Sequence, residues 1–201
     1  MTGRMLRRTA AVLLAAVLAG GLAACSDDPL ATQYLEGSNK GFIAGDSRVL
    51  ETPPDQRGEP IVFDGTTETG ATLTSAELAG QVVVVNFWYA ACGPCRAEAS
   101  ELAESAASFA DQDVTFLGVN IYDQPATTIS FMETYGVEYP SLIAVDDADL
   151  TLAFADAVPL TAVPVTLVLD REGRVASRII GQIPDPSILN TLVRDTLAET
   201  S

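Results

Sequence analysis

The sequence contains no histidine among its 201 residues. Imidazole is the usual base for serine and cysteine nucleophiles and a common metal ligand, so its absence excludes Ser-His-Asp triads, Cys-His nucleophiles and histidine metal sites. Basic residues are also few, because 11 Lys and Arg stand against 27 Asp and Glu, for a net charge of −16. A chain this acidic is a poor partner for nucleic acid or anionic lipid surfaces. Cysteine is the leading catalytic side chain that remains.

Cysteine itself is scarce, with three copies, and the first lies in a targeting segment. Three arginines precede the apolar run 10–19, and Leu22-Ala23-Ala24-Cys25 follows, which is the pattern of a signal peptide. The run is too short for a comfortable membrane-spanning helix. The last four residues resemble a bacterial lipobox, which implies cleavage before Cys25 and attachment of the mature protein to the membrane by lipid on Cys25. The alternative is an ordinary secreted protein whose Cys25 happens to lie near the cleavage site.

The rest of the chain is expected to form one domain behind a tether. Residues 1–24 are interpreted as the signal peptide, and 25–58 as a flexible tether because the segment is polar and broken by glycine and proline. Residues 59–201 then form the domain. Without its first segment the chain keeps eight basic residues against 27 acidic ones, a balance of −19. Export matters chemically, since disulfides form and persist outside the cytoplasm.

Within the domain, strand and helix patterns alternate. The β-branched run 82–88 predicts a buried central strand, and apolar residues at steps of three and four after it predict an amphipathic helix as far as Phe109. A strand at 114–120 and a helix at 127–135 continue a βαβα order, which implies a parallel core. Further expected elements are an N-terminal hairpin of 61–63 with 71–73, a short helical turn at 75–78, an apolar segment at 142–145, a helix that starts at the acidic cluster 146–149, strands at 165–169 and 174–180, and a helix at 186–197.

The pair Cys92 and Cys95 lies where the buried strand ends and the helix begins. Unpaired amides and the positive end of a helix dipole favour a thiolate, so Cys92 is the expected nucleophile. Cys95, one turn along and expected to be more covered, can then attack a mixed disulfide between Cys92 and a client. Gly93 and Pro94 complete the motif. This cycle needs no cofactor.

Two structural interpretations of the cysteine pair compete with redox catalysis. In the first, the pair is a stabilising disulfide, but it would close only a very small loop and would stabilise the fold little. In the second, the pair is half of a zinc site. No further cysteine or histidine of the domain could complete four ligands, so no metal is expected.

The segment 86–98, together with 116–120 downstream and Val163-Pro164-Val165-Thr166 before 170–173, resembles the TlpA/ResA-like branch of the thioredoxin superfamily. The resemblance runs from about residue 61 to 181. It implies an α/β thioredoxin fold of three layers, α/β/α, with a central mixed sheet, to which the N-terminal hairpin is added. It also implies a cis bond before Pro164, with the backbone of Val163 pairing to an extended client.

The same resemblance marks further site residues. Glu98 matches a carboxylate that relays a proton from Cys95 or tunes its pKa; a Glu that merely favours the helix dipole is the alternative. Trp88 and Tyr89 match residues that border the disulfide, although Trp88 could equally belong to the core. Ala91 and Ser100 depart from the pattern, where many relatives carry an aromatic residue and a helix-kinking proline, and Asn86 replaces the buried aspartate of cytoplasmic thioredoxins.

Taken together, the sequence predicts a monomeric, membrane-anchored thiol-disulfide oxidoreductase on the extracytoplasmic face of a bacterial membrane. It would take electrons from a membrane donor and reduce exported disulfide proteins, with apocytochrome c before haem attachment as a candidate client. An oxidase or isomerase of secreted proteins would use the same residues at a less negative potential. Three further hypotheses are a peroxidase, a copper chaperone of related fold and a purely structural interaction domain.

Overall fold

The computed structural model describes residues 49–158 and 163–199. Cys25, the expected signal peptide and lipid anchor, and residues 25–48 of the expected tether lie outside these ranges. No helix within the described ranges has both the length and the apolar character needed to cross a membrane.

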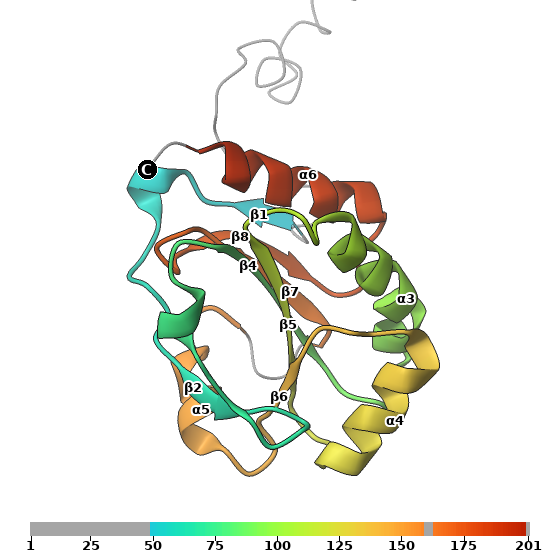
Figure 1. The fold of residues 1–201 in the computed structure, drawn as a ribbon. Coiled ribbons are helices and arrows are strands. Elements are labelled where there is room, and N and C mark those ends of the chain that lie inside the picture. The colour runs from blue at the N-terminus through green and yellow to red at the C-terminus, as the bar shows by residue number, and fades with distance from the viewer. Residues whose placement is uncertain (1–48, 159–162, 200–201) are drawn as a thin grey trace, which may run out of the picture. The chain divides into compact units, whose positions relative to one another are not determined.

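A six-stranded mixed sheet forms the centre of the described fold (Figure 1). The order is β1-β8-β7-β4-β5-β6, in which β4, β5 and β6 run parallel and the other neighbours pair antiparallel. The expected parallel core is therefore confirmed, and the three antiparallel strands β7, β8 and β1 extend it. The strands are β1 (Val49–Glu51), β4 (Val82–Trp88), β5 (Val114–Asn120), β6 (Ser141–Ile143), β7 (Val165–Leu169) and β8 (Val175–Ile180).

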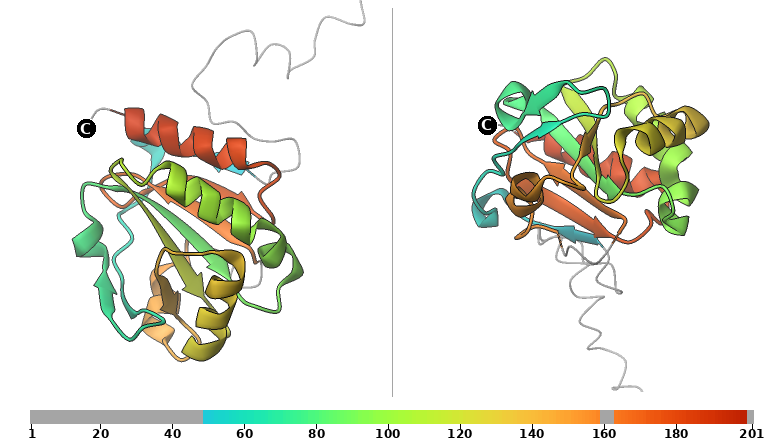
Figure 2. Two further views of the ribbon diagram at one scale, coloured as in Figure 1. Left: turned by 45° about the vertical axis from the view of Figure 1, so that its right-hand side comes forward. Right: turned by 90° about the horizontal axis from the view of Figure 1, so that it is seen from below.

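The helices cover both faces of this sheet, so the expected three layers are present. One face carries α3 (Gly93–Ser108) and α6 (Pro186–Ala198), with α4 (Pro125–Tyr135) beside α3 (Figures 1 and 2). The other face packs against α5 (Ala148–Ala153) and the N-terminal hairpin. Asp147 caps α5 by accepting a hydrogen bond from the Leu150 amide, which confirms the acidic cluster as a helix start.

Strand β4 shows why the run of valines lies at the centre. All seven of its residues are buried, and alternate side chains enter two different cores. Val82 and Val84 join the core under α3 and α6, whereas Val83, Val85 and Phe87 join the core under α5. Side chains alternate between the faces of a strand, so Asn86 and Trp88 point to the same face as α3 and bring polar and aromatic groups to the start of that helix.

The expected N-terminal hairpin exists, but its position in the sequence was wrong. Its strands are β2 (Asp64–Thr66) and β3 (Thr72–Thr74), followed by a 3-10 turn over Ser75–Leu78. Phe63, expected in the first strand, instead buries its ring against Phe154 of the core. Ile61 and Phe63 pack against the core while Val62 between them is exposed, and the strand pairing begins further along the chain, at Asp64.

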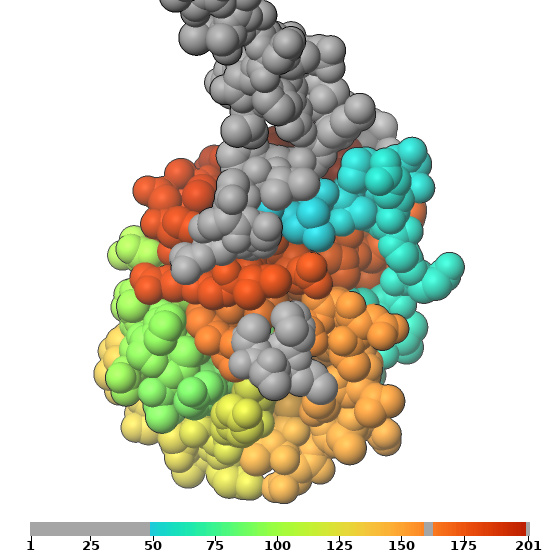
Figure 3. Space-filling view, turned by 180° about the vertical axis from the view of Figure 1, so that it is seen from behind, coloured from blue at the N-terminus to red at the C-terminus, as the bar shows by residue number. Residues whose placement is uncertain are grey.

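The last ten residues of the expected tether, 49–58, are part of the fold, and this corrects the boundary placed at residue 59. Strand β1 pairs antiparallel with β8 at one edge of the sheet, and a 3-10 turn (Pro54–Gln56) follows. Figure 3 shows this cyan segment lying along the orange-red strand. Arg57 then forms ion pairs with Asp170 at 2.9 Å and Glu199 at 2.6 Å, with 3 % of its side chain exposed. The polar composition of residues 49–58 gave no sign that they belong to the fold. Backbone pairing of β1 and the buried guanidinium of Arg57 hold them there.

Candidate active site

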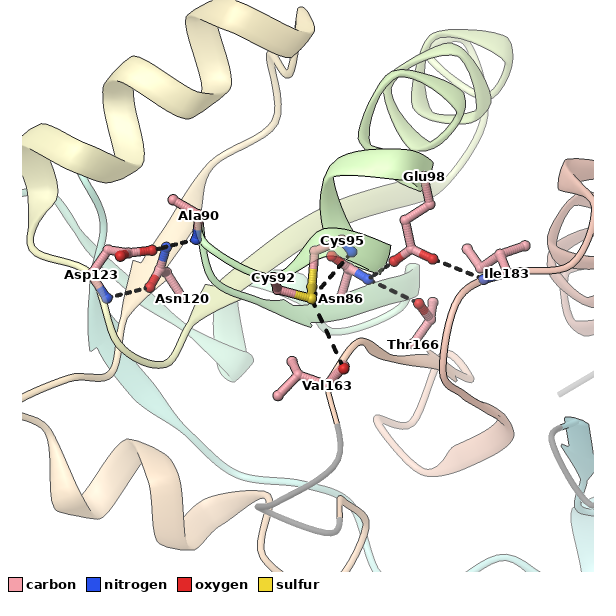
Figure 4. The surroundings of a disulfide bond; sticks show 10 residues. All are labelled: Asn86, Ala90, Cys92, Cys95, Glu98, Asn120, Asp123, Val163, Thr166 and Ile183. Atoms are coloured by element: carbon pink, nitrogen blue, oxygen red, sulfur yellow. Dashed lines mark hydrogen bonds between the residues drawn. A yellow bond between two sulfur atoms is a disulfide. The ribbon is translucent and has the colours of Figure 1, made fainter.

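Cys92 and Cys95 form a disulfide at the start of α3 (Figure 4). Cys92 is the N-cap of this helix, and its sulfur accepts a hydrogen bond from the Cys95 amide at 3.2 Å. Pro94 suits the first turn, because its ring fixes a helical φ where no amide partner is needed. The expected position of the first cysteine at a helix N-terminus is confirmed, and helix amides there favour a negative charge on its sulfur once the disulfide is reduced.

Both cysteines are almost entirely covered in the disulfide form. The exposed fraction is 4 % for Cys92 and 3 % for Cys95. Cys95 is thus only slightly more covered than Cys92, because apolar side chains surround both sulfurs. They share a cluster with Trp88, Ala99, Phe131 and Met132. Gly93 and Pro94 are exposed, so the turn between the cysteines forms the accessible part of the motif.

Val163 and Pro164, directly before β7, lie beside the Cys92 sulfur. The bond between them is cis, as the family pattern implies. The Cys92 sulfur lies 4.0 Å from the carbonyl oxygen of Val163 (Figure 4). The Pro164 carbonyl in turn accepts a hydrogen bond from the Gly181 amide at 2.8 Å, which ties this segment to the end of β8. The expected pairing of Val163 with a client remains a prediction.

Glu98 is a buried carboxylate one turn beyond Cys95. Its exposed fraction is 1 %, and it accepts hydrogen bonds from the Asn86 side chain at 3.1 Å and the Ile183 amide at 2.8 Å. Burial raises the pKa of Glu98 to about 7, against the lowering effect of those two hydrogen bonds. A Glu that only favoured a helix dipole would lie in solvent near the first turn, so the geometry contradicts that alternative.

The contacts of Asn86 explain why this position carries an amide where cytoplasmic thioredoxins carry an aspartate. Its side-chain nitrogen donates to Glu98 and also to the Thr166 hydroxyl at 3.0 Å. An aspartate here would place a second buried negative charge against Glu98, which is costly at this distance. A cavity of about 10 Å³, close to the size of one water, lies between Asn86 and Cys95 and is also lined by Tyr139 and Ser141.

Trp88 belongs both to the core and to the border of the disulfide. It is buried, and its indole nitrogen donates to the Ser141 hydroxyl at 3.1 Å. Its ring lies 4.3 Å from that of Phe131. Gly118 makes room for this contact, because a Cβ there would lie 2.6 Å from the Ser141 hydroxyl and 2.8 Å from the indole nitrogen.

Asn120 and Asp123 hold the loop before Cys92, and sequence reasoning did not identify them. The Asp123 carboxylate accepts hydrogen bonds from the Ala90 amide at 2.6 Å and the Asn120 side chain at 3.0 Å (Figure 4). Asn120 also caps the turn by accepting from the Asp123 amide at 2.8 Å. An Asn at the end of a strand with an Asp three residues later indicates a local turn. Nothing in the sequence indicates that this Asp accepts a hydrogen bond from the Ala90 amide.

Tyr89 contacts Tyr122 edge to face, with the ring centres 5.0 Å apart. Tyr122 is one of the exposed large side chains of the described chain.

Across residues 49–158 and 163–199, no group of three or more His, Cys, Asp or Glu side chains is placed to bind a metal ion.

A mixed sheet with a CxxC disulfide at a helix N-terminus and a cis proline opposite defines a protein of thioredoxin type. The model of the family described as Redoxin matches residues 53–193. The chain therefore belongs to the Redoxin family, and the resemblance to its ResA-like members is confirmed.

Named relatives and solved structures agree with this assignment. Thiol-disulfide oxidoreductase ResA of Bacillus subtilis is 29% identical over 59% of this chain and 64% of its own length. Thiol:disulfide interchange protein DsbE of Pseudomonas aeruginosa is 31% identical over 66% of this chain and 71% of its own length. A crystal structure of a thioredoxin family thiol:disulfide interchange protein from Chlorobium tepidum superposes with a TM-score of 0.63 at 28% identity, covering 71% of this chain and 97% of that one. The match thus spans just under two thirds of ResA and somewhat more of DsbE.

Proposed function

We propose that this protein is a thiol-disulfide oxidoreductase that exchanges electrons with exported protein disulfides through Cys92 and Cys95. The single observation that carries the proposal is the disulfide at the N-terminus of α3. Its first sulfur, that of Cys92, accepts a hydrogen bond from the Cys95 amide. The names of the relatives, thiol-disulfide oxidoreductase and thiol:disulfide interchange protein, support the same reaction.

The reaction begins with the reduced protein. The Cys92 thiolate attacks one sulfur of a client disulfide, and the other client sulfur leaves as a thiolate that takes up a proton. Cys95 then loses its proton and attacks the Cys92 sulfur, which releases the reduced client. Two electrons pass to the client, and the Cys92–Cys95 disulfide remains. A dithiol donor must reduce it again before the next cycle.

Glu98 is proposed as the acceptor of the Cys95 proton. It lies three residues further along the same helix, so the two side chains share a face. With a pKa of about 7, a carboxylate both accepts and returns a proton near neutrality. Asn86, whose side chain donates a hydrogen bond to Glu98, also lines the small cavity beside Cys95.

The test of the reaction is reduction of a protein disulfide by the purified chain. Wild-type protein with a dithiol reductant should reduce the disulfide, and Cys92→Ser should not react. Cys95→Ser should accumulate a mixed disulfide with the client, visible by mass spectrometry. A Cys92→Ser protein as active as wild type would refute the proposal.

The direction of electron flow is proposed to be reduction, with apocytochrome c before haem attachment as a candidate client and a membrane dithiol protein as donor. The test is the potential of the Cys92–Cys95 pair. A reductant should lie near the value of thioredoxin, about −270 mV, whereas a value near about −120 mV would identify an oxidase instead.

Export and anchoring by lipid on Cys25 are proposed from the lipobox-like segment 22–25. Cells that produce the protein and are supplied with a labelled fatty acid should incorporate the label into the wild-type protein. The Cys25→Ala protein should carry none, and label that persists in it would disprove the anchor.

A further inference from the structure

A groove of about 380 Å³ lies beside the disulfide, along α4. The loop before Cys92 contributes Ala90, and α4 contributes the other lining residues, which are Ala126, Thr127, Ser130, Phe131, Thr134 and Tyr135. None of these side chains is a carboxylate or a cation, although the chain as a whole has a charge of −16. The groove is therefore an uncharged part of an acidic protein.

The groove is continuous with the surroundings of the disulfide. Three of its lining residues, Ala90, Phe131 and Tyr135, pack in the same apolar cluster as Cys92 and Cys95. The ring centre of Phe131 lies 4.3 Å from that of Trp88 and 4.5 Å from that of Tyr135, and both pairs of rings are tilted.

The position of the groove relative to Cys92 is fixed by hydrogen bonds. Ala90 lies two residues before Cys92, and its amide is held by Asp123 at 2.6 Å. The Cys92 amide donates to the Tyr89 carbonyl at 3.1 Å, so the intervening turn is closed. In Figure 4, Ala90 and Val163 lie on different sides of Cys92. A polypeptide that pairs with Val163 and is bonded to the Cys92 sulfur would therefore continue toward the side on which Ala90 lies.

We propose that the groove receives an uncharged side chain of the client, two residues away from the client cysteine that bonds to Cys92. This inference rests on the proposed function and adds a determinant of client choice to it. An extended chain advances about 3.3 Å per residue, so that side chain lies about 7 Å from the bonded cysteine and on the same face of the client strand. A volume of about 380 Å³ accommodates a leucine with room to spare and lies within the range of ordinary ligand sites.

The lining chemistry selects against charged side chains. A client carboxylate placed in the groove would gain no cationic partner there, and it would enter a protein that is already acidic. An aliphatic side chain gains burial against Phe131 and Ala90. The Ser130 side chain lies in the middle of the α4 wall, four residues after Ala126 and four before Thr134, so a large residue at this position would fill the groove.

The experiment uses reduced full-length protein with Cys25→Ala and Cys95→Ser, so that Cys92 is its one thiol, and peptides with one cysteine capped as a mixed disulfide with thionitrobenzoate. The Cys92 thiolate attacks the peptide sulfur and expels the coloured thionitrobenzoate anion, so each rate is read by absorbance. The peptides carry Leu, Gly or Asp two residues before or two residues after the cysteine. We expect one leucine peptide to react about tenfold faster than its glycine counterpart, the low end for burial of a leucine side chain. Leucine and glycine carry the same charge, so the acidity of the protein does not affect this ratio.

Two variants of α4, each made in the same protein with Cys25→Ala and Cys95→Ser, locate the effect. Ser130→Trp should reduce the leucine-to-glycine ratio to within twofold. Ile129→Trp, an enlargement at a partly exposed position outside the groove, should leave it near tenfold. A ratio near one in the starting protein, or a ratio that survives Ser130→Trp, would overturn the groove proposal.

Free dithiobis-nitrobenzoate separates this failure from failure of the proposed function. Protein that attacks this small disulfide but shows no leucine preference retains its redox reaction and lacks the subsite. Protein in which Cys92 attacks neither the small disulfide nor any peptide would refute the redox function itself.

Discussion

The Glu98 carboxylate is buried and is held by two hydrogen bonds, from Asn86 and from the Ile183 amide, which suits it to accept a proton in this site. With a pKa of about 7, it changes its charge within the range where thiol exchange is usually measured. We expect the rate of client reduction in wild-type protein to rise with an inflection near pH 7 as the carboxylate forms. Glu98→Gln should lack this inflection and should react at least about tenfold more slowly at pH 8, a typical minimum for loss of a general base. Stopped-flow rates between pH 5 and 9 check this.

The same residue should leave a mark on stability, which serves as a control for folding. Because the folded pKa lies above the ordinary glutamate pKa of 4.5, the native state binds a proton more tightly than the unfolded chain does. Stability from this group is therefore complete below about pH 4.5 and is lost as pH rises through 7, by about 3 kcal/mol. Urea unfolding of Glu98→Gln should lack this loss, and identical pH slopes for the two proteins would contradict the assigned pKa.

Gly118 is needed for the contact between Trp88 and Ser141. We expect Gly118→Ala to lower the free energy of unfolding by about 1–3 kcal/mol, because the new methyl group would overlap both polar atoms and neither belongs to a freely moving surface chain. Gly58→Ala is the matched control, since a Cβ at that position meets nothing within 4 Å. Urea unfolding of both proteins gives the comparison, and equal stabilities would show that the site relaxes without cost.

At the residue scale, the sequence located the residues of the proposed site better than the groups that support them. Cys92, Cys95, Pro164 and Glu98 were all predicted, because each belongs to a local motif or to the family pattern. Ser141, Asp123 and the Ile183 amide were not, because their contacts join distant segments. The near-complete covering of Cys92 was not expected either, since it depends on packing around the finished turn.

Among the elements, the turn after β5 is the support of the segment that carries the disulfide. Asp123→Ala removes the acceptor for the Ala90 amide and for the Asn120 side chain. We expect the protein to lose about 1–3 kcal/mol of stability, and the Ala90 amide to exchange with deuterium at least about tenfold faster. Asp111→Ala, at an exposed position after α3, should change neither quantity. Unchanged exchange at Ala90 would mean that the loop is held by other contacts.

Elements with a strong local pattern were predicted almost to the residue, and weak ones were not. Strands β4, β5 and β7 and helices α3 and α6 coincide with the expected ranges within one or two residues, since β-branched runs, prolines at helix starts and regular apolar spacing mark their limits. Strand β1 was missed because three residues in a polar stretch carry little signal, and its pairing with β8 depends on contacts distant in the sequence. The first strand of the hairpin was displaced because Ile61 and Phe63 pack against the core and do not take part in the ladder.

For the molecule as a whole, Arg57 links the start of the folded region to its end. Its guanidinium binds Asp170, between β7 and β8, and Glu199, directly after α6. Arg57→Met should leave the buried Asp170 with one cationic partner fewer, and we expect a loss of about 3 kcal/mol in urea unfolding. Arg96→Met, at an exposed position on α3, should differ from wild type by less than about 0.5 kcal/mol. A small effect of Arg57→Met would show that the ion pairs of Arg57 contribute little to stability.

Trp88 is the only tryptophan in the chain, and it packs in one cluster with both sulfurs of the disulfide. A disulfide quenches the excited state of a nearby indole by accepting an electron, whereas a dithiol does so far less. The ultraviolet emission of the unlabelled protein therefore gives a direct optical signal of its oxidation state. Each half-reaction, with donor or with client, can be followed in real time through a reporter that the fold itself supplies.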